Sequence, residues 1–227
     1  MSGVSPAIVA PLLAWYDEGH RDLPWRAVPT PYRVWVSEIM LQQTRVEAVR
    51  SYFDRWMQAL PDIPALAAAE EAVYMKLWEG LGYYSRVRNL HRAAADVCAQ
   101  YGGELPADYD KLLALPGVGD YTAGAVASIA FGIPVPAVDG NVLRVAARLD
   151  NDFTPITDAK YKRQVRERFA ALMPADRPGD LNQSLMELGA TVCLPNGAPR
   201  CGDCPLQHLC LGFHHGNAAT LPIRTAK

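Results

Sequence analysis

The chain has 227 residues, half of them hydrophobic and a fifth charged, with a formal net charge of −2. This composition is enough for a sizeable core and excludes general disorder. No apolar run approaches the roughly 18 residues of a membrane span, and the N-terminus lacks the basic flank of a signal peptide, so we expect a cytoplasmic protein. The slight acidity argues mildly against nucleic-acid binding, although a local basic patch can bind phosphates on an acidic chain.

Apolar residues at helical spacing account for nearly the whole chain. Thr30 and Pro31 suit the N-cap and first turn of a helical segment that we expect to run to Pro61. Further helices are expected at 6–16, 65–69, 71–79, 85–100, 109–114, 121–131, 140–149, 159–172 and 181–193, with N-caps at Asp139, Asp158 and Asp180. No convincing strand or hairpin pattern occurs. The sequence therefore predicts an all-α protein.

A proline and two glycines separate two of these helices at 115–119, Leu-Pro-Gly-Val-Gly. Pro116 ends the first helix, and Gly117 and Gly119 allow a tight turn with positive φ. The next helix then begins with free N–H groups, which form a ready site for a phosphate. These five residues alone describe an ordinary glycine turn at least as well.

Four of the five cysteines lie close together, at Cys193, Cys201, Cys204 and Cys210, with the spacing C-x7-C-x2-C-x5-C. In an intracellular chain such crowding indicates metal binding rather than disulfides. The spacing alone fits either zinc or an iron–sulfur cluster. The fifth, Cys98, lies in an apolar run and is expected in the core.

A series of longer motifs occurs in order along nearly the whole chain. They are Leu-Pro-Trp-Arg at 23–26, Thr-Pro-Tyr-x-Val-Trp at 30–35, Ser-Glu-Ile-Met-Leu-Gln-Gln-Thr at 37–44, Trp-x-Gly-Leu-Gly-Tyr-Tyr-x-Arg-x-Arg-Asn-Leu at 78–90, Leu-Pro-Gly-Val-Gly-x-x-Thr-Ala-Gly at 115–124, Val-Asp-Gly-Asn-Val-x-Arg-Val at 138–145 and Asn-Gln-x-x-Met to Gly-Ala at 182–190. The set resembles the helix-hairpin-helix DNA glycosylases, and within them the MutY-type adenine glycosylases. The resemblance implies two helical lobes: 29–136 with the hairpin, and 1–28 plus 137–227 with a cluster loop at 193–210.

The resemblance implies catalytic roles for Glu38, Asp139, Asn141 and Tyr121. Glu38 lies in an apolar stretch, where partial desolvation would raise its pKa towards that of a useful general acid; a water-facing glutamate is the common alternative. Glu38 would protonate N7 of adenine, and ionised Asp139 would stabilise the oxocarbenium-like sugar or attack it transiently. Asn141 would orient groups around these carboxylates, and Tyr121 would line the pocket.

The resemblance also implies contacts to double-stranded DNA, whose target nucleotide must flip out of the duplex. Arg26 and Gln183 match positions that hold the flipped adenine, and Gln43 and Tyr83 match positions that wedge into the stack beside the opposing base. The full set comprises Trp25, Arg26, Leu41 and Gln183 for the substrate, and Gln42, Gln43, Thr44, Tyr83, Arg88, Gly117 and Gly119 for the DNA.

The residue at position 121 separates the possible activities. Endonuclease III-like enzymes carry a lysine there, whose amine attacks the sugar; Tyr121 cannot form that Schiff base, so we expect no strand cleavage. Thymine–guanine mismatch glycosylases also have tyrosine, which keeps thymine excision as the alternative, but Gln42-Gln43-Thr44 and Gly82-Tyr83-Tyr84 resemble the adenine enzymes. A non-catalytic DNA-binding module is a further alternative, against which Glu38 and Asp139 argue.

The resemblance implies that the four clustered cysteines bind a 4Fe–4S cluster, which would order the loop near Arg200 against DNA. The first gap is one residue longer than the family's C-x6-C. Full-length members carry a C-terminal domain that recognises 8-oxoguanine, and 220–227 resembles the linker into it, so the preferred opposing base stays open. Asp120 departs from expectation, because it places a negative charge at the helix start that would face phosphate. We expect a monomer, associated with the nucleoid if the source is bacterial.

Overall fold

The computed structural model describes residues 3–195 and 197–224, and within them the only regular elements are α-helices and 3-10 turns. The all-α prediction is therefore confirmed. The chain divides into two compact units, unit 1 (Met1–Arg21 and Pro134–Lys227) and unit 2 (Asp22–Ile133). Asn196 of the cysteine loop and Thr225, Ala226 and Lys227 of the expected linker lie outside the described residues.

The boundaries of the units differ from the predicted lobes at both junctions. Residues 22–28 belong to unit 2, where Trp25 packs edge-on against Phe53 with ring centroids 5.4 Å apart. Residues 134–136 belong to unit 1, where the side chain of Asn182 donates a hydrogen bond to Val135 O (2.9 Å). Local sequence patterns carry no information on these packing partners.

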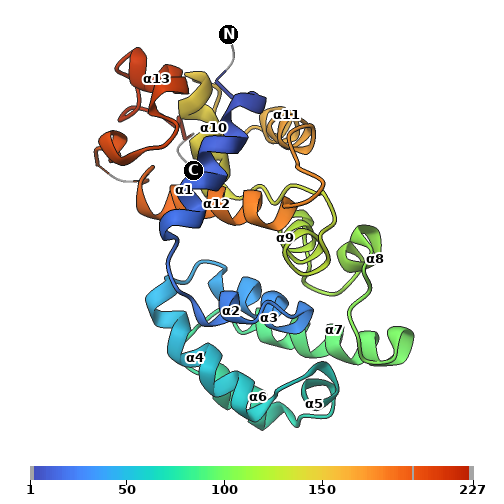
Figure 1. The fold of residues 1–227 in the computed structure, drawn as a ribbon. Coiled ribbons are helices and arrows are strands. Elements are labelled where there is room, and N and C mark those ends of the chain that lie inside the picture. Colours follow the sequence, from blue (N-terminus) through green and yellow to red (C-terminus); the bar gives the residue numbers. More distant parts are fainter. Residues whose placement is uncertain (1–2, 196, 225–227) are drawn as a thin grey trace. The chain divides into compact units, whose positions relative to one another are not determined.

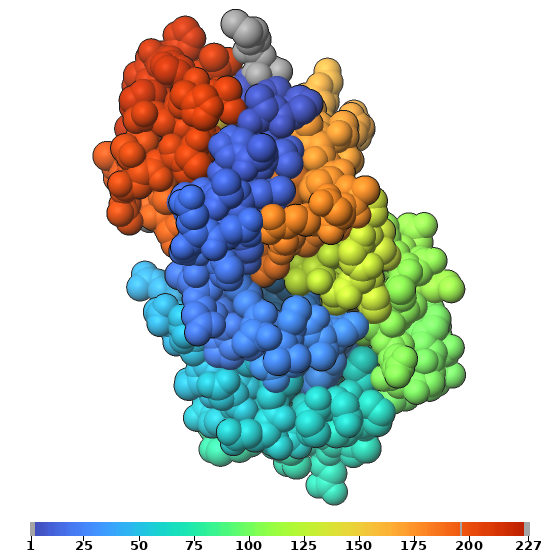
Figure 2. All heavy atoms as spheres, in the orientation of Figure 1, coloured from blue at the N-terminus to red at the C-terminus, as the bar shows by residue number. Residues whose placement is uncertain are grey.

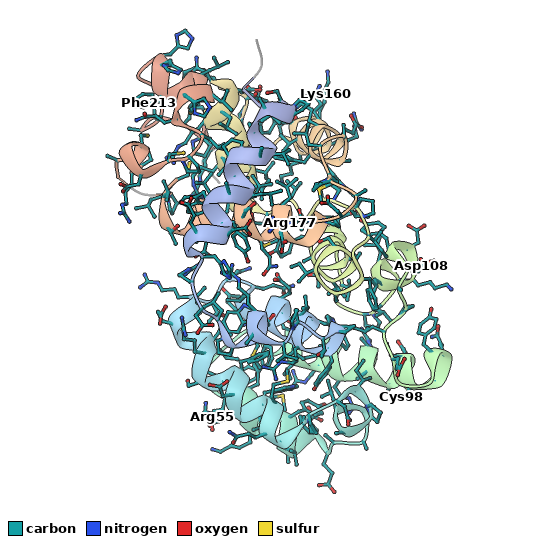
Figure 3. All side chains as sticks on the ribbon, in the orientation of Figure 1. Arg55, Cys98, Asp108, Lys160, Arg177 and Phe213 are labelled. Carbon is teal, nitrogen blue, oxygen red and sulfur yellow. The ribbon has the colours of Figure 1, made fainter. Side chains whose placement is uncertain are left out.

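Unit 2 is built around α3 (Pro31–Leu41), a helix most of whose residues are buried. Its elements are α2 (Pro24–Ala27), α3 (Pro31–Leu41), α4 (Val46–Ala59), α5 (Ile63–Ala67), α6 (Glu71–Trp78), α7 (Ser85–Tyr101), α8 (Tyr109–Leu113) and α9 (Asp120–Phe131) (Figure 1). Thr30 caps α3 as predicted, its hydroxyl accepting from Arg33 N (3.4 Å), and Asp108, labelled in Figure 3, caps α8 through Lys111 N (3.0 Å). α3 packs against α9, α4 and α7, which explains why it is buried over most of its surface.

The helical segment expected to run from Pro31 to Pro61 is interrupted, so that prediction was wrong. α3 ends at Leu41 and α4 begins at Val46, with Gln43 between them in the left-handed region (φ 58). The apolar spacing of Val49, Phe53 and Trp56 is correctly helical, because these residues form the buried face of α4. The interruption after Leu41 depends on hydrogen bonds from Arg86 of α7, and a local sequence pattern cannot predict such distant contacts.

Unit 1 is centred on α10. Its elements are the 3-10 turn η1 (Pro6–Ile8), α1 (Val9–Gly19), α10 (Gly140–Asp150), α11 (Ala159–Ala170), α12 (Pro178–Thr191), the 3-10 turns η2 (Cys201–Asp203) and η3 (Gln207–Leu209), and α13 (Leu211–His214). α10 packs against α12, α13 and α11, and α1 lies on α12 (Figure 2, blue on orange).

The predicted N-caps of unit 1 had mixed outcomes. The carboxylate of Asp139 accepts from the first turn of α10, and that of Asp158 accepts from Tyr161 N in α11 (2.8 Å). Asp180 is not a cap: α12 begins at Pro178, and Asp180 lies in its first turn, paired with Arg177 (2.7 Å). A proline in the first turn started this helix earlier than the apolar spacing indicated.

Among the described residues no helix has the length and apolar character to cross a membrane.

Candidate active site and cysteine loop

Glu38 is buried in α3, with 6% of its surface exposed, and is not the water-facing glutamate of the common alternative. The hydroxyl of Tyr121 donates a hydrogen bond to Glu38 Oε2 (2.8 Å). Tyr121 lies in the first turn of α9, and the packing of α3 on α9 brings the two together. The predicted acid, Glu38, and Tyr121 are therefore direct hydrogen-bond partners.

Asp139 holds the start of α10 in unit 1. Its Oδ1 accepts from Asn141 N (2.8 Å) and Val142 N (2.9 Å), while its Oδ2 accepts from the Asn141 side chain (2.8 Å). Burial raises the pKa of Asp139, and these hydrogen bonds oppose that rise. The carboxylate is thus fixed in orientation by its own helix end, and the predicted cap is confirmed.

A chain of hydrogen bonds continues from Asp139 to the first cluster cysteine. Asn141 Oδ1 accepts from Arg144 Nη2 (2.8 Å), and Arg144 also donates to Gly189 O (2.8 Å) and Cys193 O (2.8 Å). A Cβ on Gly189 would lie 2.7 Å from Asn141 Cβ, so only glycine allows this approach of α12 to α10. The orientation of Asn141 therefore depends on both helices and on the cysteine loop.

Two buried polar residues of α12 were missed as site residues. Asn182, 1% exposed, accepts from Ala137 N (2.9 Å) and donates to Val135 O, and so fixes the segment that leads into Asp139. Glu187, 2% exposed, forms a two-pronged ion pair with Arg21 (2.7 and 3.0 Å). A polar residue in the middle of an apolar helical face was the available signal. Gln183, predicted to hold the base, is half-buried on the same helix.

The predicted contact residues of unit 2 divide into exposed and interior ones. Gln43 and Tyr83 are exposed, and both have left-handed backbone (φ 58 and 47). Gln42, half-buried, donates to Thr122 Oγ1 (3.4 Å), and Trp25 lies in the core at 5% exposure. The other members are Arg26, Leu41 and Thr44, which are half-buried, and Arg88, which is exposed and paired with Glu71 (3.2 Å).

The hairpin contains one glycine with positive φ rather than the expected two. Gly117 has φ 76, and a Cβ there would lie 2.7 Å from Asn89 Cβ. Gly119 has φ −102 and serves as the N-cap of α9, so the positive φ predicted for it was wrong. Asp120 follows in the first turn, where the helix dipole favours a negative charge, and accepts from the hydroxyl of Tyr109 (2.8 Å). These contacts explain why a negative charge is tolerated at the start of α9.

The four clustered cysteines border one cavity, which is also lined by Arg148, Val192 and Phe213. All four thiols are free of disulfides. Burial raises the pKa of Cys204 to about 12 and also raises the pKa values of Cys201 and Cys210. Thiolates here therefore need a strong positive charge beside them, such as a metal centre supplies.

The shape of this cavity bears on the kind of centre. A zinc ion at about 2.3 Å from each sulfur draws four thiolates to one point. Within residues 3–195 and 197–224 no three Cys, His, Asp or Glu side chains form a ready-made metal site, and the four thiols line a common cavity. Arg148 donates to Cys193 Sγ (3.2 Å) and Leu194 O (2.8 Å), supplying positive charge at its edge. Four thiols around a cavity with a cationic edge are a donor set for a metal centre, either zinc or an iron–sulfur cluster.

Comparisons with known proteins agree with these features. Residues 36–174 match the HhH-GPD superfamily of base excision DNA repair proteins. The chain is similar to adenine DNA glycosylases of Mus musculus (45% identity, 94% of this chain and 44% of the relative), Homo sapiens (46%, 88% and 38%) and Mycolicibacterium smegmatis (42%, 92% and 71%). It spans less than half the length of the mammalian relatives.

Solved structures give the same result for the fold. A thermostable thymine-DNA glycosylase superimposes with a TM-score of 0.81 at 28% identity, covering 92% of this chain and 96% of that one. Endonuclease III in a non-covalent DNA complex superimposes with a TM-score of 0.76 at 26% identity, covering 92% and 95%. The likeness in fold therefore extends over about nine-tenths of this chain.

Proposed function

Because the chain belongs to the HhH-GPD superfamily of base excision DNA repair proteins, and within it to the MutY-type adenine glycosylases, we propose that it excises adenine mispaired with 8-oxoguanine or guanine in duplex DNA. The observation that carries the proposal is the buried Glu38 with Tyr121 as its hydrogen-bond donor. A protonatable carboxyl away from water suits the leaving-group chemistry of a purine, and identity to adenine glycosylases of 42–46% over about nine-tenths of the chain supports it.

In the proposed reaction the two carboxylates have different tasks. Glu38 gives its proton to N7 of the flipped adenine, so the glycosidic electron pair leaves with a neutral base. Asp139 stays ionised and stabilises the positive charge that develops on the sugar, until water adds to C1′ and releases a proton. Asn141 supports Asp139 through its side-chain donor (2.8 Å). Arg26 and Gln183 would hold the base, and Gln43 and Tyr83 would fill the space that it leaves.

Strand cleavage is not part of the proposed activity. A lyase step of the endonuclease III kind needs an amine that forms a Schiff base with the sugar, and Tyr121 offers a phenol engaged with Glu38. The product is therefore an abasic site in an intact strand.

Thymine excision from T opposite G is the second candidate. It is favoured by the structural similarity to a thymine-DNA glycosylase (TM-score 0.81). The higher identity to adenine enzymes, 45% against 28%, places it second.

We also propose that Cys193, Cys201, Cys204 and Cys210 hold a 4Fe–4S cluster. The cavity that they border and the raised pKa values of three of the thiols support a metal centre here, and the likeness of the cysteine spacing to the family pattern favours the cluster over zinc. The cluster would supply structural order, holding η2 and the neighbouring Arg200 towards DNA. Absorption distinguishes the alternatives: an iron–sulfur protein purified without oxygen is brown with a broad band near roughly 400 nm, whereas a zinc protein is colourless.

The proposed function also implies a partner and a cellular location. Duplex DNA is the proposed partner of a monomeric protein acting in the cytoplasm, at the nucleoid if the cell is bacterial.

The deciding experiment is single-turnover excision on three matched duplexes, with A opposite 8-oxoguanine, A opposite G and T opposite G. Each product is split, half treated with hot alkali and half untreated. Strand breaks only after alkali, and only on the adenine duplexes, are the expected result. Excision of T but not A would transfer the chain to the thymine group, and breaks without alkali would overturn the assignment of Tyr121.

A further inference from the structure

Two turns of unit 2 each hold an exposed side chain on unusual backbone. The first, turn 42–45, lies between α3 and α4 and contains Gln43; the second, turn 79–84, lies between α6 and α7 and contains Tyr83. Both residues have positive φ (58 and 47), and Tyr83 is 61% exposed. Residues other than glycine persist in this region only when their surroundings hold them there. Something in the structure must therefore fix both turns.

A single guanidinium, that of Arg86 in α7, joins the two turns. Its Nη1 donates to the end of α3 and into turn 42–45, at Ile39 O (2.9 Å), Met40 O (3.1 Å) and Gln42 O (2.5 Å). Its Nη2 donates to turn 79–84, at Leu81 O (3.1 Å) and Gly82 O (3.2 Å), and lies 3.5 Å from Thr44 Oγ1. The carbonyls left free where α3 ends thus find their donors on one side chain.

Two aromatic rings also contact the guanidinium of Arg86. The guanidinium carbon lies 5.3 Å from the ring centroid of Trp78 and 5.5 Å from that of Tyr83. Burial lowers the pKa of Arg86, but a guanidinium stays charged in proteins at any ordinary pH. The planar fork of arginine carries donors on two separate terminal nitrogens, and here each of them reaches a different turn, whereas lysine has all its donors on a single nitrogen.

We propose that Arg86 is a positioning residue that locks turns 42–45 and 79–84 to each other and so presents Gln43 and Tyr83, preformed, to a base stack that has lost one nucleotide. This inference rests on the proposed glycosylase function. An aromatic ring and a planar amide on rigid turns suit the space between stacked bases, and preformed geometry spares the ordering that would otherwise oppose base flipping. Arg86 itself need not contact DNA.

The first test needs no DNA. Amide hydrogen exchange is measured on the full chain with its metal centre, for wild type, Arg86→Met, Arg86→Lys and the control Arg92→Met. Arg92 is exposed on the same helix and donates to Asn89. In Arg86→Met we expect both turns to exchange about tenfold faster or more, together, with little change elsewhere. Protection lost from one turn alone, or from neither, would overturn the lock.

The second test links the lock to flipping. A fluorescent adenine analogue that reports unstacking, carried on a non-hydrolysable sugar, is bound to each variant, and single-turnover excision is measured in parallel. Arg86→Met should lower the flipped fraction and the excision constant by about tenfold, with Arg86→Lys between it and wild type and Arg92→Met unchanged. If Arg86→Met fails to fold, the exchange and flipping values of Arg86→Lys decide. Unchanged flipping in a variant with loosened turns would overturn the inference, whereas a wild type that excises no adenine would instead overturn the proposed function.

Discussion

Glu38 in unit 2 is buried and Asp139 in unit 1 is half-buried, and the two carboxylates are held by hydrogen bonds of different range along the sequence. Asp139 accepts from residues two and three positions further along the chain, so its setting is local. Glu38 accepts from Tyr121, 83 positions away, on another helix. A local setting forms as soon as the helix end forms, whereas the setting of Glu38 exists only after α3 and α9 have packed. The two units thus fix the orientation of a carboxylate by different routes.

The largest effect should come from neutral replacement of either carboxylate. We expect Glu38→Gln and Asp139→Asn each to lower the single-turnover excision constant by about 10²- to 10⁴-fold, because one loses the proton donor and the other the negative charge beside the sugar. Duplex affinity should stay close to wild type in a filter-binding measurement. Glu167→Gln, which alters an exposed pair on α11, is the control. A variant with near wild-type rate would remove its residue from the mechanism.

This contrast also explains what the sequence could predict. Thr30, Asp139 and Asp158 were identified as caps because a cap and its donors lie within three residues. The interruption after Leu41 was not, since the donor to its carbonyls is Arg86, more than 40 residues on. Burial of Glu38 could be proposed from its apolar neighbours, but not its partner. Contacts distant in sequence follow from packing alone, and no spacing pattern encodes them.

A second, smaller effect is expected on stability, from one closely packed glycine in each unit. A Cβ on Gly117 in unit 2 or on Gly189 in unit 1 would lie 2.7 Å from the Cβ of an asparagine. Alanine at either site should lower the free energy of unfolding by about 1–3 kcal/mol through overpacking. Gly117→Ala should cost about 1–2 kcal/mol more, because its φ of 76 disfavours any side chain.

Chemical denaturation of both alanine variants measures this difference. Gly19→Ala, on α1 with no atom within 4 Å of the added Cβ, should be neutral or slightly stabilising. Equal losses for Gly117→Ala and Gly189→Ala would mean that crowding alone decides and that backbone strain at the hairpin contributes nothing measurable.

Next in size is the long-range hydrogen bond of Glu38. Tyr121→Phe removes the hydroxyl and keeps the ring, so we expect about a tenfold lower excision constant, the size of one lost hydrogen bond to a charged or ionisable group. Strand cleavage should remain absent, since phenylalanine brings no amine. Tyr109→Phe, which removes a comparable bond to Asp120 at 2.8 Å, is the matched control and should leave the rate on bound duplex nearly unchanged. Equal effects of the two would show that Tyr121 acts through general stability.

The smallest effect expected is a shift along the pH axis of the acid side of the pH–rate profile, where Asp139 becomes protonated. Burial already raises the pKa of Asp139, and the Asn141 side chain opposes that rise by donating to Oδ2. Asn141→Ala removes this donor to the ionised form, so the pKa of Asp139 should rise further. Excision needs ionised Asp139, and its rate falls as pH drops through that pKa; the acid limb of the variant should therefore lie at higher pH than that of wild type. Because the backbone donors of positions 141 and 142 remain, the rate on the plateau should fall less than in Tyr121→Phe. A pH–rate profile of the single-turnover constant measures both quantities, and an acid limb that stays in place or moves to lower pH would show that Asn141 supports Asp139 by orientation alone.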